Sequence, residues 1–336
     1  MADAPLAITL GDPAGIGPEI ILGAYQALAA GKRSPAIPFF VVGGVDVLRD
    51  AARQCEAECT IVPIADPSEA AMAIHAGLPV MAGLDAPYTP GKPVSAGAKL
   101  AIASLTYATK FTLSGLASGL VTAPVAKAEL MALGFDYPGQ TEFLADACGK
   151  TYRDAVMMLA GPSLRTVPLT VHTALAEVPG LISTDLIVHK ARIIAEGLTR
   201  DFGIERPRLA IAGLNPHSGE GGQFGDEEAR IIEPAIAALK TEGHDVWGPV
   251  PGDALFTPRA RPTYDAALCM YHDQALIPLK ALEFDEGVNV TMGLPIIRTS
   301  PDHGTAFDIA GSGKADASAM ITAIRMAADM VAKRAR

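Results

Sequence analysis

The sequence predicts an α/β fold with a largely parallel sheet. Short apolar runs alternate along the chain with longer segments of helical periodicity, a pattern typical of strands that are joined by crossover helices. The chain has 336 residues, and chains of this length usually form two domains rather than one hydrophobic core. We therefore expect two α/β domains with a cleft.

The predicted elements follow this alternation. In the first half, strands are predicted at 6–10 ("LAITL"), 39–44 ("FFVVGG") and 119–124 ("GLVTAP"), and helices at 18–30 and 95–115. In the second half, strands are predicted at 156–161, 166–172, 208–215 and 267–272, and helices at 183–202 and 226–240. Ser183 and Gly203 fit the ends of the helix at 183–202, because serine oxygens cap helix N-termini and glycine ends helices.

Composition excludes several classes of partner. Lys and Arg number 27 against 37 Asp and Glu, a formal charge of −10, and no basic cluster is present, so nucleic acid and anionic membranes are not expected partners. No apolar run is long enough to span a bilayer, and no signal-like leader precedes the first strand, which favours a cytoplasmic protein. The four cysteines form no C-x-x-C pair, so we expect reduced, structural thiols.

Three of the seven histidines stand at the ends of predicted strands. His172, His217 and His272 follow "TVPLTV", "LAIAGLNP" and "AALCMY". In a parallel sheet these positions face the ligand cleft, and three neutral imidazoles can bind a divalent cation and leave coordination positions open. The alternative is that each is a hydrogen-bonded histidine at a strand end.

The loop around His217, "GLNPHSGEGG", is rich in glycine and brings backbone close to a ligand. Downstream of His272 the chain carries Lys280, Asn289 and Arg298. Two cations and an amide can bind a phosphate or carboxylate; the alternative, favoured for the two cations taken alone, is a solvated surface Lys and Arg. "GDPAGIG" at 11–17 lacks the third glycine of a Rossmann fingerprint, and "GKT" at 149–151 lacks the first glycine of a P-loop, so neither site is expected.

Seven motifs in order resemble those of the 4-hydroxythreonine-4-phosphate dehydrogenase family: "GDPAGIGPE", "TAPVAK", "GQTEFLA", "GLNPHSGEGG", "MYHDQ", "GVNVTMGLPIIRTSPDHGTA" and "DIAGSGKAD". The resemblance implies two interlocked α/β domains similar to those of isocitrate and isopropylmalate dehydrogenases, with a cleft between them and a non-Rossmann dinucleotide site. We expect one domain, 1–125 plus 300–336, to contribute the NAD site. The other, 126–299, would carry the metal and substrate residues and the interface of a homodimer whose sites share residues across it.

The resemblance also assigns roles to single residues. It implies a metal at His172, His217 and His272, which agrees with the choice made from strand ends, and a dinucleotide, NAD or NADP, at His303, Gly304 and Thr305. The metal can be zinc, cobalt, magnesium or manganese. Substrate contacts fall on Gln140, Thr141, Lys280, Asn289 and Arg298. Gln140 replaces a histidine of the family's pattern and, unlike it, cannot carry a proton.

The implied reaction is the metal-dependent, NAD-linked oxidation of the C3 hydroxyl of 4-phosphooxy-L-threonine. Decarboxylation to 3-amino-2-oxopropyl phosphate follows, in pyridoxal 5'-phosphate (vitamin B6) biosynthesis. Asp253, Asp273 or a metal-bound water would take the hydroxyl proton. Asp273 can instead orient His272. We also count Lys280 among the expected catalytic residues. Lys127, Asp12 and Glu19 are equally compatible with the cleft and with the surface.

Three alternatives remain open. The first is a sister dehydrogenase acting on threonate or erythronate 4-phosphate or on a carboxylated cis-dihydrodiol. The second is a metal-dependent hydrolase that uses the three histidines to activate water. The third is a catalytically silent binding protein, which would be expected to have lost some of these residues.

Overall fold

The computed structural model describes residues 4–29 and 38–335. Its contacts divide the chain into two units: unit 1 comprises Met1–Thr151 and Leu294–Arg336, and unit 2 comprises Tyr152–Gly293. Unit 1 is therefore built from both ends of the sequence. Residues 126–151, which we expected in the second domain, group with unit 1, as does the segment 294–299.

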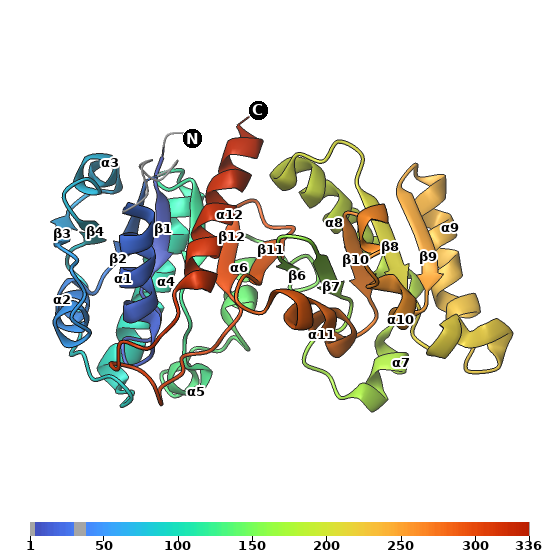
Figure 1. Cartoon of the computed structure of the whole chain (residues 1–336), viewed down its shortest axis with the longest axis horizontal. Coiled ribbons are helices and arrows are strands. Elements are labelled where there is room, and N and C mark those ends of the chain that lie inside the picture. The colour runs from blue at the N-terminus through green and yellow to red at the C-terminus, as the bar shows by residue number, and fades with distance from the viewer. Residues whose placement is uncertain (1–3, 30–37, 336) are drawn as a thin grey trace. The chain divides into compact units, whose positions relative to one another are not determined.

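Unit 1 contains a parallel sheet with the strand order β3-β4-β2-β1-β5-β12. In Figure 1, β12 and α12, from the last part of the chain, lie among the blue and cyan elements of its first part. The elements are β1 (Leu6–Thr9), α1 (Gly17–Ala29), β2 (Phe39–Val42), α2 (Val45–Gln54), β3 (Ile61–Ile64), a 3-10 turn (Pro67–Glu69), α3 (Ala70–Ala73), β4 (Leu78–Met81), α4 (Ser95–Leu113), β5 (Gly119–Thr122), α5 (Lys127–Met131), α6 (Gln140–Ala147), β12 (Arg298–Pro301) and α12 (Ser318–Arg334).

Unit 2 contains strands in the order β11-β6-β7-β10-β8-β9. Strands β7, β10, β8 and β9 are parallel, whereas β6 runs antiparallel to both β11 and β7. The elements are β6 (Val156–Ala160), β7 (Arg165–Pro168), a 3-10 turn (Leu175–Glu177), α7 (Val178–Leu181), α8 (Thr184–Phe202), β8 (Arg208–Ala212), a turn (Pro216–Gly222), a π-helical turn (Glu228–Ile232), α9 (Glu233–Thr241), β9 (Asp245–Val250), α10 (Gly252–Leu255), a 3-10 turn (Arg261–Thr263), β10 (Ala266–Cys269), α11 (His272–Glu283) and β11 (Val288–Met292).

The largely parallel α/β fold is confirmed. Each strand and helix range predicted from the sequence overlaps an element of the predicted type. Residue 30, the last of the predicted helix 18–30, lies outside the described residues. The predicted ends of α8 are also correct, because the Ser183 hydroxyl accepts a hydrogen bond from the Leu186 amide at 3.2 Å and Gly203 is left-handed with φ 69°. The predicted helix 226–240 differs in its first turn, which is a π-turn.

The register of unit 2 brings three strand ends to one edge of the sheet. Thr166, Val167 and Pro168 of β7 pair with Ala267, Leu268 and Cys269 of β10, and β10 pairs in parallel with β8 from Ala266 to Leu268. All four residues of β10 are buried, as expected for a central strand that is covered on both faces. The segments that follow β7, β8 and β10 therefore leave the sheet on the same side.

In the ranges 4–29 and 38–335, we find no helix that combines the length and apolar character needed to cross a membrane.

Candidate active site

The three predicted metal ligands follow three neighbouring parallel strands. His172 comes after β7, His217 after β8, and His272 is the first residue of α11, directly after β10. The rings of His172 and His272 lie 5.8 Å apart between centroids. Within one chain no three His, Cys, Asp or Glu side chains of the described residues form a metal-binding group. The structure thus brings two of the predicted ligands together and places the third on the adjacent strand end.

Two of these histidines have a strained backbone. His172 has φ 49° and His217 has φ 51°, a left-handed conformation that is uncommon for residues with a side chain. From His217 to Gly221 five successive residues are left-handed, with φ between 41° and 79°. Such strain persists only where the surroundings hold it, and it concentrates at functional sites. A plain glycine turn would not require His217, Ser218 and Glu220 in this conformation.

In two of the three histidines, one ring nitrogen contacts a neighbouring carboxylate. The Nδ1 atom of His272 lies 2.7 Å from Oδ1 of Asp273, and Nδ1 of His217 lies 3.0 Å from Oε2 of Glu220. The Glu220 hydrogen bond raises the pKa of His217 above its usual value. A carboxylate on Nδ1 leaves Nε2 as the ligand atom and fixes the orientation of the ring, the usual arrangement around a metal-binding imidazole.

Glu228 organises the His217 loop and was not recognised from the sequence. The residue is 3% exposed. Its carboxylate accepts hydrogen bonds from the backbone amides of Leu214 and Asn215, both at 2.8 Å, and from the Asn215 side chain at 2.9 Å. In the sequence it is one of several acidic residues in the predicted helix 226–240. A π-helical turn begins at Glu228, and such turns often occur at functional sites. No sequence pattern predicts this turn, so it could not have identified Glu228.

Unit 1 holds the guanidinium of Arg298 below its surface. Arg298 begins β12, is 4% exposed, and donates from Nη2 to Oγ1 of Thr122 at 2.8 Å. Burial lowers its pKa to about 10, so it is charged at neutral pH. Gln140 and Thr141 begin α6, and Gln140 donates to the carbonyl of Ala123, one residue beyond β5, at 3.2 Å.

The remaining predicted substrate and catalytic residues belong to unit 2. Lys280 lies in the last turn of α11, with its amine 6.0 Å from the ring centroid of Phe284. Asn289 lies on β11, opposite Leu159 of β6. Asp253 lies in α10 and is exposed. The Arg298 and Lys280 cations therefore belong to different units, and only Arg298 is fully buried.

The segment 303–313, which begins with the predicted dinucleotide residues His303, Gly304 and Thr305, is attached to the opening loop of the chain. The Ile16 amide donates to the carbonyl of Thr305 at 2.9 Å. The carboxylate of Glu19 accepts hydrogen bonds from the amides of Gly311 and Gly313. Ala306 is left-handed with φ 42°. Glu19 is thus a buried anchor of this loop, 7% exposed, and the surface position considered for it does not hold.

Asp12, in the same opening loop, is also buried, with 1% of its surface exposed. Its Oδ1 accepts from the Ala14 amide at 2.9 Å. Burial raises its pKa despite this hydrogen bond. A surface role is therefore excluded for Asp12 as well.

Three predicted ligand-contacting residues carry buried polar atoms without a partner. Within the described part of the chain these atoms are Oε1 of Gln140, Oδ1 of Asn289 and Nε2 of His303. An unsatisfied buried polar atom costs about 1–3 kcal/mol. A bound ligand or an ordered water would satisfy these atoms.

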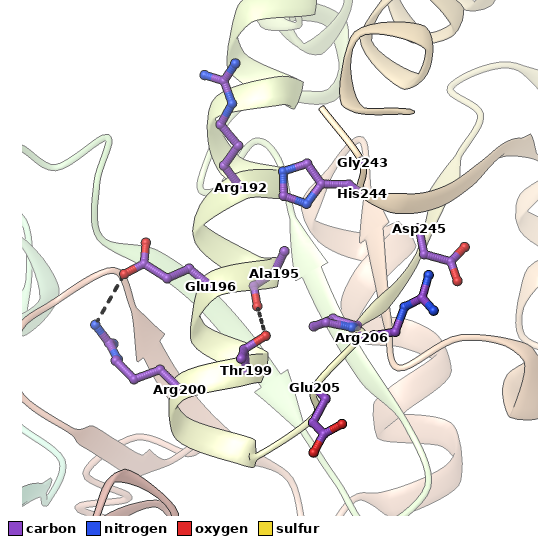
Figure 2. A pocket seen from close by; sticks show the side chains of 11 residues that line it. Arg192, Ala195, Glu196, Thr199, Arg200, Glu205, Arg206, Gly243, His244 and Asp245 are labelled. Atoms are coloured by element: carbon purple, nitrogen blue, oxygen red, sulfur yellow. Dashed lines mark hydrogen bonds and ion pairs between the residues drawn. The ribbon is translucent and has the colours of Figure 1, made fainter. Parts of the chain in front are cut away.

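A separate pocket in unit 2 lies between α8 and the start of β9 (Figure 2). Its lining includes Arg192, Arg200, Arg206 and His244, but also Glu196, Glu205 and Asp245. Arg192 binds Glu242 in a fork, and Arg200 binds Asp201 in the same way. Two of the three arginines are thus already paired, and none of the predicted site residues lines the pocket, so we do not place the active site there.

The chain matches a known protein family over most of its length. The family profile described as "Pyridoxal phosphate biosynthetic protein PdxA" matches residues 36–327. The chain belongs to the PdxA family. The curated 4-hydroxythreonine-4-phosphate dehydrogenase of Erythrobacter litoralis is 60% identical to this member over 331 residues, which cover 98% of each chain. The resemblance stated from the seven motifs is thereby confirmed, and the relative is a dehydrogenase, as that resemblance implied.

Solved structures agree with the family. A 4-hydroxythreonine-4-phosphate dehydrogenase from Klebsiella pneumoniae superposes with a TM-score of 0.85 at 39% identity and covers 98% of each chain. A terephthalate 1,2-cis-dihydrodiol dehydrogenase from Burkholderia xenovorans superposes with a TM-score of 0.65 at 29% identity, covering 97% of this chain and 98% of its own. This PdxA-family chain is therefore more similar to the former enzyme than to the latter.

Proposed function

We propose that this PdxA-family dehydrogenase oxidises the C3 hydroxyl of 4-phosphooxy-L-threonine with NAD and that the product decarboxylates to 3-amino-2-oxopropyl phosphate. The observation that carries the proposal is the placement of His172, His217 and His272 at three neighbouring parallel strand ends, in a chain 60% identical to a 4-hydroxythreonine-4-phosphate dehydrogenase.

The three histidines fit a divalent metal. Asp273 and Glu220 occupy Nδ1 of two of the rings, so Nε2 of each is the atom that would hold the ion. When bound, the metal lowers the pKa of the substrate hydroxyl and stabilises the negative charge that develops during decarboxylation. Imidazole ligands suit zinc and cobalt, and magnesium or manganese if oxygen ligands complete the shell.

The chain's own cations would bind the phosphate. Arg298 presents a rigid, buried guanidinium, which suits a bidentate contact with phosphate oxygens, and Lys280 adds a point charge. Thr141, Asn289 and Gln140 would donate or accept hydrogen bonds. The phosphate is remote from the bond that changes, so these contacts supply positioning.

We assign the proton transfer to Asp253 and the orientation of His272 to Asp273. The Asp273 carboxylate is engaged with Nδ1 of His272 at 2.7 Å, so removing a substrate proton would compete with that bond. Asp253 is exposed on α10, and its charge interacts with the imidazole of His217, which supports a position near the proposed metal ligands. His303, Gly304 and Thr305 would bind the dinucleotide, with the loop held by Glu19. NADP remains an alternative cofactor.

We further propose that the enzyme is a cytoplasmic homodimer whose sites share residues between subunits. In one described chain the three histidines do not form a metal-binding group, which fits a site completed by a second copy. Exposed apolar side chains in unit 2, including Leu175, Leu181 and Ile277, fit an interface. The free cysteines fit a reducing compartment.

The test measures NADH formation by absorbance with 4-phosphooxy-L-threonine and with threonate and erythronate 4-phosphates, before and after chelation and after metal is restored. We expect metal-dependent turnover of the amino acid alone. His272→Ala should lower kcat/KM by about 1000-fold, because loss of metal catalysis removes several kcal/mol of transition-state stabilisation.

The control is His75→Ala, which changes a histidine of unit 1 outside the proposed site and should leave turnover unchanged. Preference for a sugar acid would move the proposal to the sister activity and make Gln140 the first residue to examine. Full activity of the His272 variant would refute the metal assignment.

A further inference from the structure

Side-chain hydrogen bonds link the three histidine-bearing strand ends beyond the point where the sheet itself connects them. The hydroxyl of Thr170 donates to the carbonyl of Met270 at 2.9 Å. The side-chain oxygen of Gln274 accepts from the Met270 amide at 2.7 Å, and its nitrogen donates to the carbonyl of Gly213 at 2.8 Å. Thr170 and Met270 each lie two residues before a predicted metal ligand, and Gly213 lies four before one.

The backbone ladder ends just before these contacts. Between β10 and β8 the last paired residues are Leu268 and Ile211, and between β7 and β10 the Leu169 amide still donates to the Cys269 carbonyl at 2.7 Å. Beyond Leu268 and Ile211, the Gln274 side chain continues the connection between the β10 and β8 exits. It therefore acts where the sheet no longer sets the distance between the two loops.

The two segments that Gln274 joins are otherwise well fixed. The His217 loop is held at its start by Glu228 and by the bond from the Gly213 amide to the Val250 carbonyl at 2.8 Å. On the other side, Gln274 and His272 share the first turn of α11. One amide thus fixes a rigid loop start against the helical turn that carries His272.

We propose that Gln274 is a positioning residue that sets the places of His217 and His272 for metal binding. The inference rests on the proposed metal site. Because each loop is fixed within its own chain, it holds whichever subunit supplies each imidazole. Loss of the amide frees the first turn of α11 from the Gly213 loop and leaves the Gly213 carbonyl unsatisfied. Asp273 and Glu220 then still orient the two rings, but neither fixes the position of the loop or helical turn that carries its imidazole.

Metal affinity, rather than activity, tests the proposal. The metal-free full-length protein is titrated with Co²⁺, and its visible d–d absorption reports both the dissociation constant and the coordination geometry. We expect Gln274→Ala to weaken Co²⁺ binding by about 10- to 100-fold, the range found when a group that supports a metal ligand is removed, and to change the spectrum.

Gln274→Glu separates the hydrogen bond from the shape. It keeps the size and the acceptor for the Met270 amide, but it places a carboxylate against the Gly213 carbonyl and should weaken binding at least as much. Gln26→Ala is the matched control, because it removes an amide that also donates to a carbonyl, that of Glu58 at 3.2 Å, in unit 1. Fluorescence of Trp247, on β9 next to β8, checks that unit 2 remains folded.

The outcomes distinguish this inference from the proposed function. Tight binding by the wild type and Gln26→Ala, with weakened binding by a folded Gln274 variant, supports the inference. Equal affinities and spectra for wild type and both Gln274 variants overturn it and leave the metal site intact. Failure of the wild type to bind Co²⁺, or equal binding by His272→Ala, overturns the metal site and the inference together.

Discussion

Lys190 gives unit 2 a pH-dependent stability whose size follows from its burial. The residue lies on α8, is 9% exposed, and donates from its amine to the carbonyl of Leu169 at 2.8 Å. Burial, with a smaller contribution from Arg153, lowers its pKa from 10.5 to about 8. The folded chain therefore binds this proton less tightly than the unfolded chain. At 1.36 kcal/mol per pKa unit the difference corresponds to about 3 kcal/mol.

The sign of the effect is set by linkage. Below pH 8 the amine is charged in both states, and its burial destabilises the fold by the full amount. Between pH 8 and 10.5 the unfolded state binds more protons, so the free energy of unfolding rises with pH. Lys190→Met carries no charge and lacks this rise. We expect the wild type to gain about 3 kcal/mol relative to Lys190→Met across this window.

The assay is urea unfolding at several pH values from 7 upward, followed by the fluorescence of Trp247, the chain's one tryptophan, which reports on unit 2. Comparing the two proteins at each pH cancels the titration of other groups. Lys240→Met, which changes an exposed lysine on α9, is the control and should differ from wild type by a constant. A Lys190→Met difference that does not change with pH would refute the reasoning.

Two further variants test single contacts. Ser183→Ala removes the N-cap bond to the Leu186 amide and should lower the free energy of unfolding of unit 2 by about 1 kcal/mol, measured by urea unfolding with Trp247 fluorescence; an unchanged midpoint would contradict the capping role. Glu19→Gln weakens the charge-assisted bonds to Gly311 and Gly313 and should raise the KM for NAD by about 10-fold, with a smaller change in kcat. Glu69→Gln, on an exposed turn of unit 1, is the control and should leave the KM for NAD unchanged. A fall in kcat of Glu19→Gln without a rise in its KM for NAD would contradict the anchoring role.

Strand ends were predictable from the sequence because they depend on local patterns. Apolar runs located β7, β8 and β10, and the rule for parallel sheets then placed His172, His217 and His272 on one edge. The same reasoning missed β12, "RTSP", although all four of its residues are buried. Its polar side chains are satisfied by partners far along the chain, for example Thr299 by the Ala323 carbonyl at 2.9 Å, and no periodicity records such partners.

The supporting contacts of the site were out of reach for a related reason. Gln274 was visible in "MYHDQ", but its bond to Gly213 spans 61 residues and depends on where two loops leave the sheet. The left-handed run at His217 was equally hidden, since only the glycines of that loop suggested unusual backbone angles. Residue type and strand position therefore indicated the proposed ligands, whereas the residues that hold the loops around them could be identified only from the fold.

The discontinuity of unit 1 sets an order of events during translation. Domains generally fold as units, N-terminal first, as the chain leaves the ribosome. Here Tyr152–Gly293 is complete before Leu294–Arg336 has been made, and β12 pairs with β5 through Arg298 and Leu120. Until β12 is made, this edge of β5 in unit 1 remains unpaired, whereas all residues of unit 2 are already present and can fold. Arg298, the buried cation proposed for the phosphate, lies on the strand that pairs with this edge, so the proposed phosphate contact can form only after β12 has been made.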